Sequence, residues 1–344
     1  MQTHLPERRR PTMRDVARQA RVSLKTVSRV VNAEPGVSET LAARVRKAID
    51  ELGFRPHAGA STLRRSGGRT GTVGLLLPDV AGPFSAAVLR AVEDVAAEHA
   101  VLLLAGSVDG DPQRERDLVQ ALLDHRADGL VLAPTGADLG HLEGELRAGT
   151  AVVCVDRPAP GLAVDAVVAT NADGTAEAVA HLVAIGHRRI AFLGGRRGSY
   201  PSDERERGHA RALAAAGLAV DPALVVRGLD HPCDADRAVA ALLDAADPPT
   251  ALFAGDGDLT MGAVRALHRL DRQDRVALAG FDDVPLGDLL HPGVTVVTQD
   301  AAAMGHTAAT VLFARLDGDR TPARVIPVGT TLVRRGSGEI PPPR

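Results

Sequence analysis

The side chains with the clearest chemistry in this 344-residue chain lie between residues 12 and 32, TMRDVARQARVSLKTVSRVVN. Two short amphipathic segments follow one another there, with only a tight turn between them. The exposed face of the second segment carries Leu24, Lys25, Ser28 and Arg29. A polar, cationic helix packed on a second short helix is what a helix-turn-helix needs to enter a major groove. The pattern therefore predicts an element that binds double-stranded DNA.

Start and stop residues delimit three helices in this region. Thr12 is expected to cap the first helix with Asp15 as its reciprocal partner, and Ser23 is expected to open the second. A third helix is expected over 38–52, capped by its first serine and ended by Gly53. Apolar residues recur at helical spacing on the inner faces: Val16, Ala17, Ala20, Val27, Val30, Val31, Leu41, Val45 and Ile49. Three such helices make a small bundle that can fold independently.

The charge distribution supports DNA as the partner. Residues 1–70 hold 15 Arg or Lys and 6 Asp or Glu, whereas the remainder holds 25 basic and 37 acidic residues. The formal net charge of −3 therefore conceals a strongly basic N-terminal part. Such a part is the electrostatic footprint of phosphate binding.

Composition narrows the class further. No apolar run reaches the roughly 18 residues of a membrane span, and the Arg-rich start lacks a secretory signal, so a cytoplasmic protein without a membrane partner is expected. Cys154 and Cys233 are expected to be reduced thiols. The 12 histidines are scattered, and no metal, cofactor or catalytic residue is predicted.

The pattern of apolar residues along the sequence changes at Thr72. Short apolar runs alternate with helical segments, and we expect them to be buried strands: 73–78, 101–106, 129–134, 151–156, 189–195, 250–255 and 276–283. Continuous apolar strands separated by helices predict parallel sheets covered on both faces. The fold class is therefore α/β with two doubly wound lobes, preceded by a three-helix head. Ligands of such sheets bind beyond the carboxyl ends of the strands.

In sequence order, these elements resemble the lactose-repressor (LacI/GalR) family of bacterial transcription regulators. The resemblance rests on VS.KTVSRVVN and ELGF.P in the head, then AGPF, VDRP, HRRIAFLGG, GFDD and LVRRGS. It implies a helix-turn-helix domain at 11–57, a hinge helix and linker at 58–71, and a periplasmic-binding-protein-like effector-binding and dimerisation module at 72–338. It also implies a homodimer on pseudo-palindromic operator DNA.

The resemblance assigns roles to residues of the head. Leu24, Lys25 and Arg29 would face base edges, and the guanidinium of Arg29 suits the O6 and N7 acceptors of guanine. Phosphate contacts would come from Thr12, Ser23, Thr26, Ser28 and Asn32. For Ser23 and Thr26, helix capping is an equally good explanation. In the hinge, Ala60 would approach the minor groove and Leu63 would wedge into a base step.

In the effector module the resemblance implies contacts to a small sugar or sugar derivative, and whether that ligand is an inducer or a corepressor is left open. The implied contacts are Asp79, Phe84, Asp156, Arg157, Arg205, Asp256 and Asp282. Each carboxylate has an alternative role as a cap at a strand or helix end.

Two other classes of protein were weighed against a regulator. An α/β enzyme lacks support, because the chain has neither a G-x-x-x-x-G-K-[ST] loop nor a G-x-S-x-G elbow. A two-lobed solute-binding protein shares the second module, but the DNA-binding head and the missing signal segment argue against it. A regulator that activates a promoter stays open.

Overall fold

The computed structural model describes residues 11–32, 34–55, 69–136 and 139–343. The chain divides into two compact units, Met1–Gly71 and Thr72–Arg344, and each is described by itself. The predicted hinge residues Ala60 and Leu63 lie outside the described residues. Within the described residues no helix is long and apolar enough to cross a membrane.

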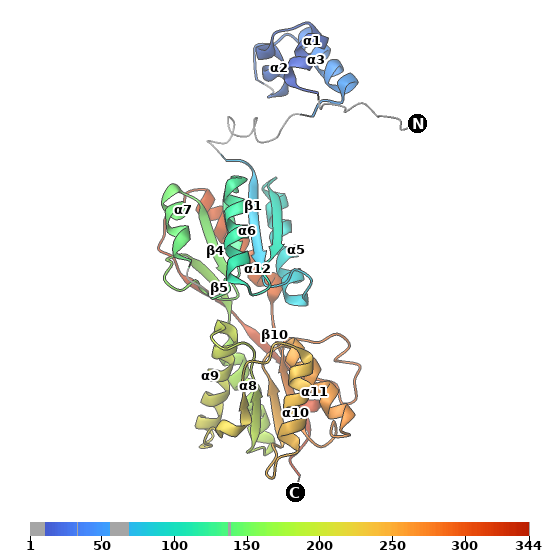
Figure 1. Cartoon of the computed structure of the whole chain (residues 1–344), viewed down its shortest axis with the longest axis vertical. Helices are drawn as coiled ribbons and strands as arrows, with labels where there is room; N and C mark the ends of the chain where they lie inside the picture. The colour runs from blue at the N-terminus through green and yellow to red at the C-terminus, as the bar shows by residue number, and fades with distance from the viewer. Residues whose placement is uncertain (1–10, 33, 56–68, 137–138, 344) are drawn as a thin grey trace, which may run out of the picture. The chain divides into compact units, whose positions relative to one another are not determined.

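The first unit contains α1 (Met13–Ala20), α2 (Leu24–Val31) and α3 (Glu39–Leu52) around one small core (Figure 1). Val16, Val27 and Val45 are fully buried there, so the expected inner faces are confirmed. Ser38 stands at the cap position of α3, but its hydroxyl makes no capping hydrogen bond, and the predicted side-chain cap is therefore wrong.

The turn between α1 and α2 depends on one unusual residue. Arg21 adopts a left-handed backbone with φ 52°, a conformation usually left to glycine. The Arg44 guanidinium of α3 donates a 2.5 Å hydrogen bond to the Ala20 carbonyl, and so holds the exposed carbonyl end of α1. The turn is therefore fixed by contact with the third helix.

In the second unit, each lobe is built around a six-stranded sheet (Figure 1). The sheet of lobe 1 has the order β11-β5-β4-β3-β1-β2 and is parallel throughout. Its strands are β1 (Thr72–Leu77), β2 (Leu102–Ser107), β3 (Gly129–Leu132), β4 (Ala151–Val155), β5 (Asp165–Ala169) and β11 (Val325–Val328). Its helices are α5 (Pro83–Glu98), α6 (Pro112–Asp124), α7 (Glu143–Ala148) and α12 (Ala301–Leu316).

The sheet of lobe 2 has the order β12-β10-β9-β8-β6-β7. Its strands are β6 (Ile190–Leu193), β7 (Val225–Val226), β8 (Ala251–Ala254), β9 (Ala277–Phe281), β10 (Thr295–Gln299) and β12 (Thr330–Val333). Its helices are α8 (Asn171–Ile185), α9 (Tyr200–Ala215), α10 (Pro232–Leu243) and α11 (Gly257–Arg269). Short 3-10 turns lie at Gly140–Leu142, Pro222–Leu224 and Ser337–Glu339.

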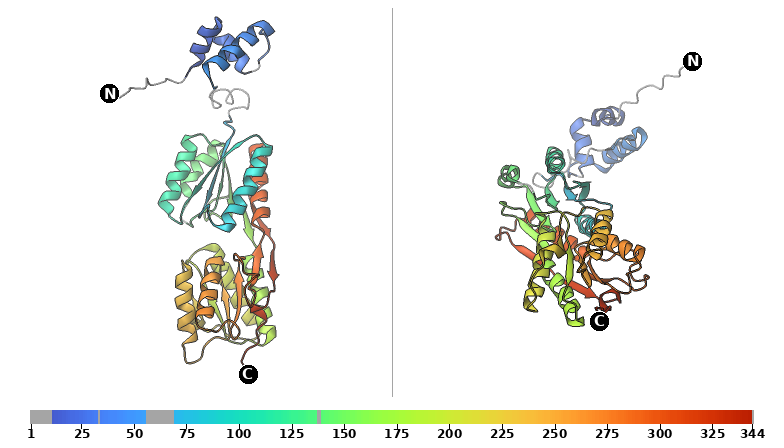
Figure 2. Two further views of the ribbon diagram at one scale, coloured as in Figure 1. Left: turned by 90° about the vertical axis from the view of Figure 1, so that its right-hand side faces the viewer. Right: turned by 60° about the horizontal axis from the view of Figure 1, so that its bottom comes forward.

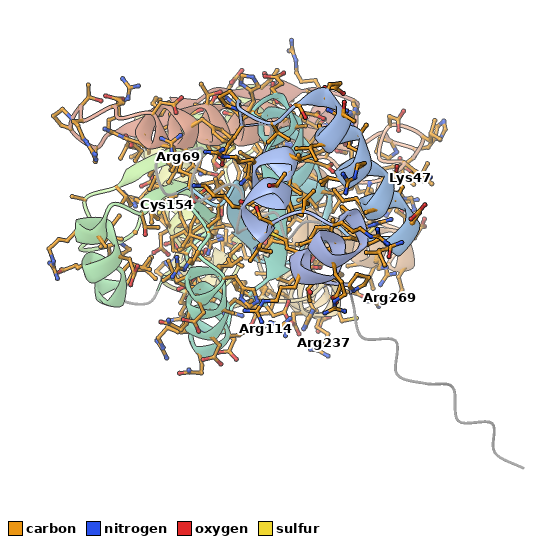
Figure 3. The ribbon with its side chains drawn as sticks, turned by 90° about the horizontal axis from the view of Figure 1, so that it is seen from above. Lys47, Arg69, Arg114, Cys154, Arg237 and Arg269 are labelled. Carbon is orange, nitrogen blue, oxygen red and sulfur yellow. The ribbon has the colours of Figure 1, made fainter. Side chains whose placement is uncertain are left out.

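Helices cover both faces of each sheet (Figure 2). In lobe 1, Leu75 and its neighbours pack on α5 and α12, while Leu76 packs on the face of α6 and α7. In lobe 2, Leu193 faces α10 and α11, and Phe192 faces α8 and α9. Charged side chains such as Arg237 stay on the surface, whereas Cys154 is buried within its sheet (Figure 3).

All seven predicted strands are present, but the expectation of burial is wrong for β2, a partly exposed edge strand. The expectation of purely parallel sheets is wrong at β12, which runs antiparallel to β10. The reason is topological. Both sheets direct the carboxyl ends of their parallel strands toward the interlobe cleft. A chain that leaves lobe 1 at the end of β11 and continues through Gly329 must therefore enter lobe 2 running away from the cleft.

Within the described residues, the chain passes between the lobes after β5, after β10 and after β11. Two of these crossovers are bonded to each other. The Thr170 N–H donates to the Val328 carbonyl at 2.9 Å, and the Thr330 N–H donates to the Thr170 hydroxyl at 3.1 Å. These two crossovers therefore behave as one connection.

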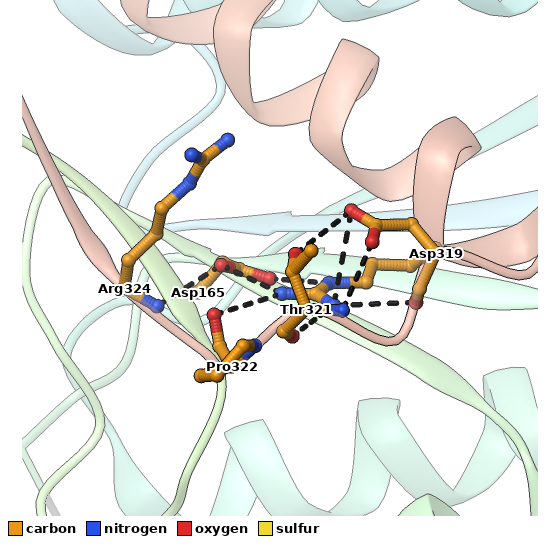
Figure 4. Close-up of polar contacts among 6 residues, drawn as sticks. Asp165, Asp319, Thr321, Pro322 and Arg324 are labelled. Atoms are coloured by element: carbon orange, nitrogen blue, oxygen red, sulfur yellow. Dashed lines mark hydrogen bonds and ion pairs between the residues drawn. The ribbon is translucent and has the colours of Figure 1, made fainter.

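A largely buried ion pair joins the end of α12 to the start of β5 in lobe 1 (Figure 4). Arg315 of α12 donates to both carboxylate oxygens of Asp165 at 2.7 and 3.1 Å, and the Asp165 side chain is only 3% exposed. The same guanidinium donates to the backbone carbonyls of Asp319, Thr321 and Pro322. One side chain thus anchors the loop that leads from α12 to β11.

Candidate functional site

The candidate DNA-contacting surface is the outer face of α2. Leu24 is 46% exposed and Lys25 is exposed, with no core contact that would require an apolar or cationic residue there. Arg29 lies one turn beyond Lys25, with its Nε 3.9 Å from the Glu34 carboxylate. An exposed pair at that distance contributes roughly 0–1 kcal/mol, so Arg29 can leave Glu34 for a base.

The predicted phosphate contacts have structural roles in this head. The Ser23 hydroxyl accepts the Thr26 N–H at 3.1 Å, which makes Ser23 the N-cap of α2. The Thr12 hydroxyl and N–H both donate to the Asp15 carboxylate, which is the Asp15 half of the expected capping box. Thr12, Ser23 and Thr26 remain placed at or near helix starts, where backbone N–H groups attract phosphate.

Asn32 fits its predicted phosphate contact poorly. It is only 7% exposed, and its amide donates to the Ser28 hydroxyl at 3.3 Å and to Glu34 at 3.4 Å. A buried amide with partners inside the domain acts first to end α2. Its structural role explains its residue type without any contact to DNA.

The second candidate site is a cleft between the lobes with a volume of about 1130 Å³. It opens at the carboxyl ends of the strands of both sheets. All seven predicted effector residues line it: Asp79, Phe84, Asp156, Arg157, Arg205, Asp256 and Asp282. They come from segments more than 200 residues apart, and the fold brings them to one place.

Asp156 and Asp282 occupy equivalent positions in the two lobes. Each directly follows a central strand, β4 or β9, and each has a left-handed backbone, with φ of 72° and 65°. Each donates its N–H at 2.8 Å to a valine carbonyl of the neighbouring strand. A left-handed non-glycine residue costs about 1–2 kcal/mol, and such strain is concentrated at functional sites. The pair therefore presents two carboxylates to the cleft from opposite lobes.

Arg205 is the central cation of the cleft, and it is 5% exposed. Its Nε donates to Asn171 Oδ1 at 2.8 Å and its Nη1 to the Gly255 carbonyl at 2.6 Å. Its Cζ lies 3.6 Å from the centre of the Phe281 ring, within range of a cation–π contact. Three fixed contacts hold the guanidinium, and its remaining N–H groups are available to a ligand.

The helix that carries Arg205 packs unusually close to α8. A Cβ on Gly208 would lie 2.3 Å from the Ala172 carbonyl oxygen, so only glycine fits there. This approach sets Arg205 beside Asn171, the first residue of α8. The glycine three residues after Arg205 is thus required by the close packing of the two helices.

Two carboxylates on the lobe 2 side of the cleft, Asp256 and Asp282, have raised pKa values. Burial raises the pKa of Asp256 to about 6, against the opposing effects of the Leu259 N–H and Arg205. Burial also raises the pKa of Asp282, again opposed by Arg205 and by Gln299. The Asp256 Oδ1 accepts the Leu259 N–H at 2.8 Å, so this residue is both the N-cap of α11 and a cleft carboxylate.

Two polar residues of this site were not predicted. Gln299, the last residue of β10, donates its amide to Asp282 Oδ1 at 2.7 Å, and its Oε1 has no partner among the described residues. Asn171 is 1% exposed and positions Arg205. Asp79 lines the cleft but also has a structural role, because its carboxylate accepts the Ala81 N–H in the turn before α5. Within the described residues, no cluster of side chains could hold a metal ion.

Comparisons with known proteins agree with this geometry. Residues 12–57 match the bacterial regulatory proteins of the lacI family, and residues 179–338 match the periplasmic binding protein-like domain. The chain is 35% identical to the HTH-type transcriptional regulator PtxS of Pseudomonas aeruginosa over 97% of both chains. It is 32% identical to the HTH-type transcriptional regulator GalR of Escherichia coli over 95% of this chain and 96% of that protein.

Solved structures extend the comparison. The complex of the transcriptional regulator CelR with cellobiose has a TM-score of 0.70 at 30% identity, covering 95% of this chain and 100% of that one. The lac repressor dimer bound to operator has a TM-score of 0.81 at 24% identity, covering 96% and 99%, and shows the shared fold. The relatives are transcription regulators and not enzymes, which sets the catalytic alternative aside. The chain therefore belongs to the lacI family of bacterial regulatory proteins, as a helix-turn-helix transcription regulator with an effector-binding domain.

Proposed function

We propose that this regulator is a cytoplasmic repressor that binds a pseudo-palindromic operator as a homodimer under the control of a small sugar-like effector. Residues 11–57 would bind the operator, 58–71 would form the hinge, and 72–338 would bind the effector and the partner subunit. Ala60 and Leu63 would act in the minor groove. The observation that carries the proposal is the convergence on one interlobe cleft of the seven side chains that the family resemblance implied.

A ligand in this cleft can control DNA binding only if it binds one lobe arrangement better than another. The crossovers after β5 and β11 are hydrogen-bonded to each other through Thr170 and Thr330. The two lobes can therefore reorient about these interlobe crossovers, which are separate from the hinge at 58–71. The effector is an inducer if it weakens operator binding and a corepressor if it strengthens it. CelR forms a complex with cellobiose, which favours a carbohydrate as the effector of this chain.

The test of the effector half begins with a thermal-shift screen of carbohydrates and nucleosides on the full chain. Operator binding is then measured with each stabilising compound, on duplexes selected from a random pool. We expect at least one compound to change the operator affinity about 5–150-fold, the usual range of allosteric coupling. Stabilising compounds that all leave operator affinity unchanged would contradict effector control.

Replacement of Arg29 by alanine should remove sequence discrimination. We expect the selected operator to lose about 1–3 kcal/mol of binding free energy while random DNA loses far less. Gel-shift titrations of both duplexes measure this, and Arg46→Ala is the matched control, since Arg46 is an exposed arginine of α3. Equal losses on both duplexes would instead make Arg29 a phosphate contact. Affinity should also fall steeply with salt.

The homodimer is supported by apolar side chains that are exposed within the described part of one chain. Leu102 and Leu104 are 60% and 36% exposed on β2, which is an edge strand of its sheet. In lobe 2, Leu286 and Leu289 are 69% and 65% exposed. A second copy would cover such patches, and a symmetric dimer suits a two-fold operator. Sedimentation that finds only monomer at micromolar concentration would contradict this.

A further inference from the structure

The charges that line the cleft are unbalanced. Seven of the lining residues are carboxylates: Asp79, Asp156, Asp256, Asp258, Asp282, Asp283 and Asp300. Only three are cations, Arg157, Arg196 and Arg205, and no lysine or histidine lines the cleft in the described part of the chain. The cleft is therefore an acidic environment for any ligand.

Some of these charges are already compensated. Arg157 donates two hydrogen bonds to Asp156, at 3.0 and 2.7 Å. Arg335, outside the cleft, holds both oxygens of Asp283 at 2.6 and 2.7 Å. Arg196 donates to the Gly110 carbonyl of the opposite lobe at 3.0 Å. Neither Asp256 nor Asp282 has a cationic partner at ion-pair distance among the described residues, and Arg205 is the only cation near them.

Helix starts would normally make such a cleft attractive to anions, because their free N–H groups carry partial positive charge. Here carboxylates of the protein itself accept hydrogen bonds from the N–H groups at two of the helix starts. Asp256 accepts the Leu259 N–H of α11, and Asp300 accepts the Ala303 N–H of α12 at 2.8 Å. Of the helices that begin at the cleft, α5 and α9 have no carboxylate cap, and of these two only α9 carries a cation that lines the cleft, Arg205.

An anionic group bound by Arg205 would sit near the start of α9, beside two half-buried carboxylates, Asp256 and Asp282. Asp258 and Asp282 both contribute to the raised pKa of Asp256, and Asp156 contributes to that of Asp282. A further negative charge in this low-dielectric space would be destabilised by all of them.

Hydroxyl groups suit the same atoms well. The second oxygens of Asp256 and Asp282 and the Oε1 of Gln299 can accept hydrogen bonds, and the remaining N–H groups of Arg205 can donate them. Phe84 adds an apolar surface. We propose that the effector is a polyhydroxy compound without a negative charge, and that the cleft rejects sugar phosphates and sugar acids. This inference rests on the proposed function.

The test compares sugars that differ only in charge. Isothermal titration of the full chain would use the glucose, galactose and ribose series, each with its neutral sugar, its amino sugar, its sugar acid and its phosphate ester. We expect the neutral or amino member of at least one series to bind at least tenfold more tightly than either anionic member. A sugar acid or phosphate that binds more tightly than its neutral counterpart would overturn the inference but leave effector control intact. Binding by no member of any series would overturn the proposed sugar effector and this inference together.

Two variants link the selectivity to named residues. In Asp256→Asn and in Asp282→Asn, we expect the ratio between neutral and anionic affinities to fall at least threefold, because one repelling charge is gone. Asp274→Asn, an exposed residue that does not line the cleft, removes the same charge and should leave the ratio unchanged. A ratio that stays constant in both cleft variants, or that falls equally in the control, would overturn the inference. Asp258→Asn, at an exposed cleft position, serves if the Asp256 or the Asp282 variant fails to fold.

Discussion

Replacement of Arg205 by methionine is expected to weaken effector binding at least about 30-fold, which corresponds to the lower end of the 2–5 kcal/mol lost when a buried charged partner is truncated. Methionine fills much of the volume on the Phe281 ring but donates no hydrogen bonds. Asn171 Oδ1 and the Gly255 carbonyl lose their donor, and the ligand loses its only central cation. Isothermal titration with the compound found in the screen measures the change.

The control for this experiment is on the same helix. Arg207 is an exposed neighbour whose side chain pairs with Glu204 and does not line the cleft. Arg207→Met should leave effector affinity unchanged. Removal of Arg205 should also raise the pKa of Asp256 further, because Arg205 lowers it in the native protein. An Arg205→Met protein that folds and binds effector with native affinity would remove Arg205 from the site.

The second large effect concerns stability. Arg315→Ala is expected to lower the free energy of unfolding of the effector-binding unit by about 3–5 kcal/mol, the usual cost of breaking a buried ion pair. Asp165 would be left as an unpaired carboxylate with 3% exposure, and the carbonyls of Thr321 and Pro322 would lose their donor. Urea unfolding followed by circular dichroism measures the loss of unfolding free energy.

Arg320→Ala provides the comparison for Arg315. Arg320 lies in the same loop and is exposed, so its removal should change the unfolding free energy by less than about 0.5 kcal/mol. A loss below about 1 kcal/mol for Arg315→Ala would mean that the ion pair contributes little and that its burial is compensated elsewhere.

The sequence predicts the fold well where apolar residues form an unbroken run, although it misses the fully buried β5, which begins with Asp165. The run at 189–195 and the other apolar runs are strands because parallel strands covered on both faces need apolar residues at every position. The strands missed, such as β10 and β12, carry Thr and Gln at the edge of the sheet or at the cleft. Their mixed composition reflects their position beside the crossovers, which local periodicity does not encode.

The candidate site is predictable in part for a similar reason. Asp156 and Asp282 follow predicted strands, and the carboxyl ends of parallel strands meet at one edge of each sheet. Asn171 and Gln299 have no such signal, because their roles depend on contacts across the chain with Arg205 and Asp282. Asn32 and Ser38 show the converse case, in which a residue of the right type at the right position does something else.

The threefold passage of the chain between the lobes has a consequence for synthesis on the ribosome. The core of lobe 1 needs Leu312 and Phe313 of α12, and its sheet needs β11, so the lobe cannot close until residues up to Val328 have emerged. The core of the first unit uses only residues 13–54, so that bundle can form early. We therefore expect a nascent chain in which the DNA-binding head is folded while lobe 1 still exposes apolar surface, a stage at which chaperones would bind.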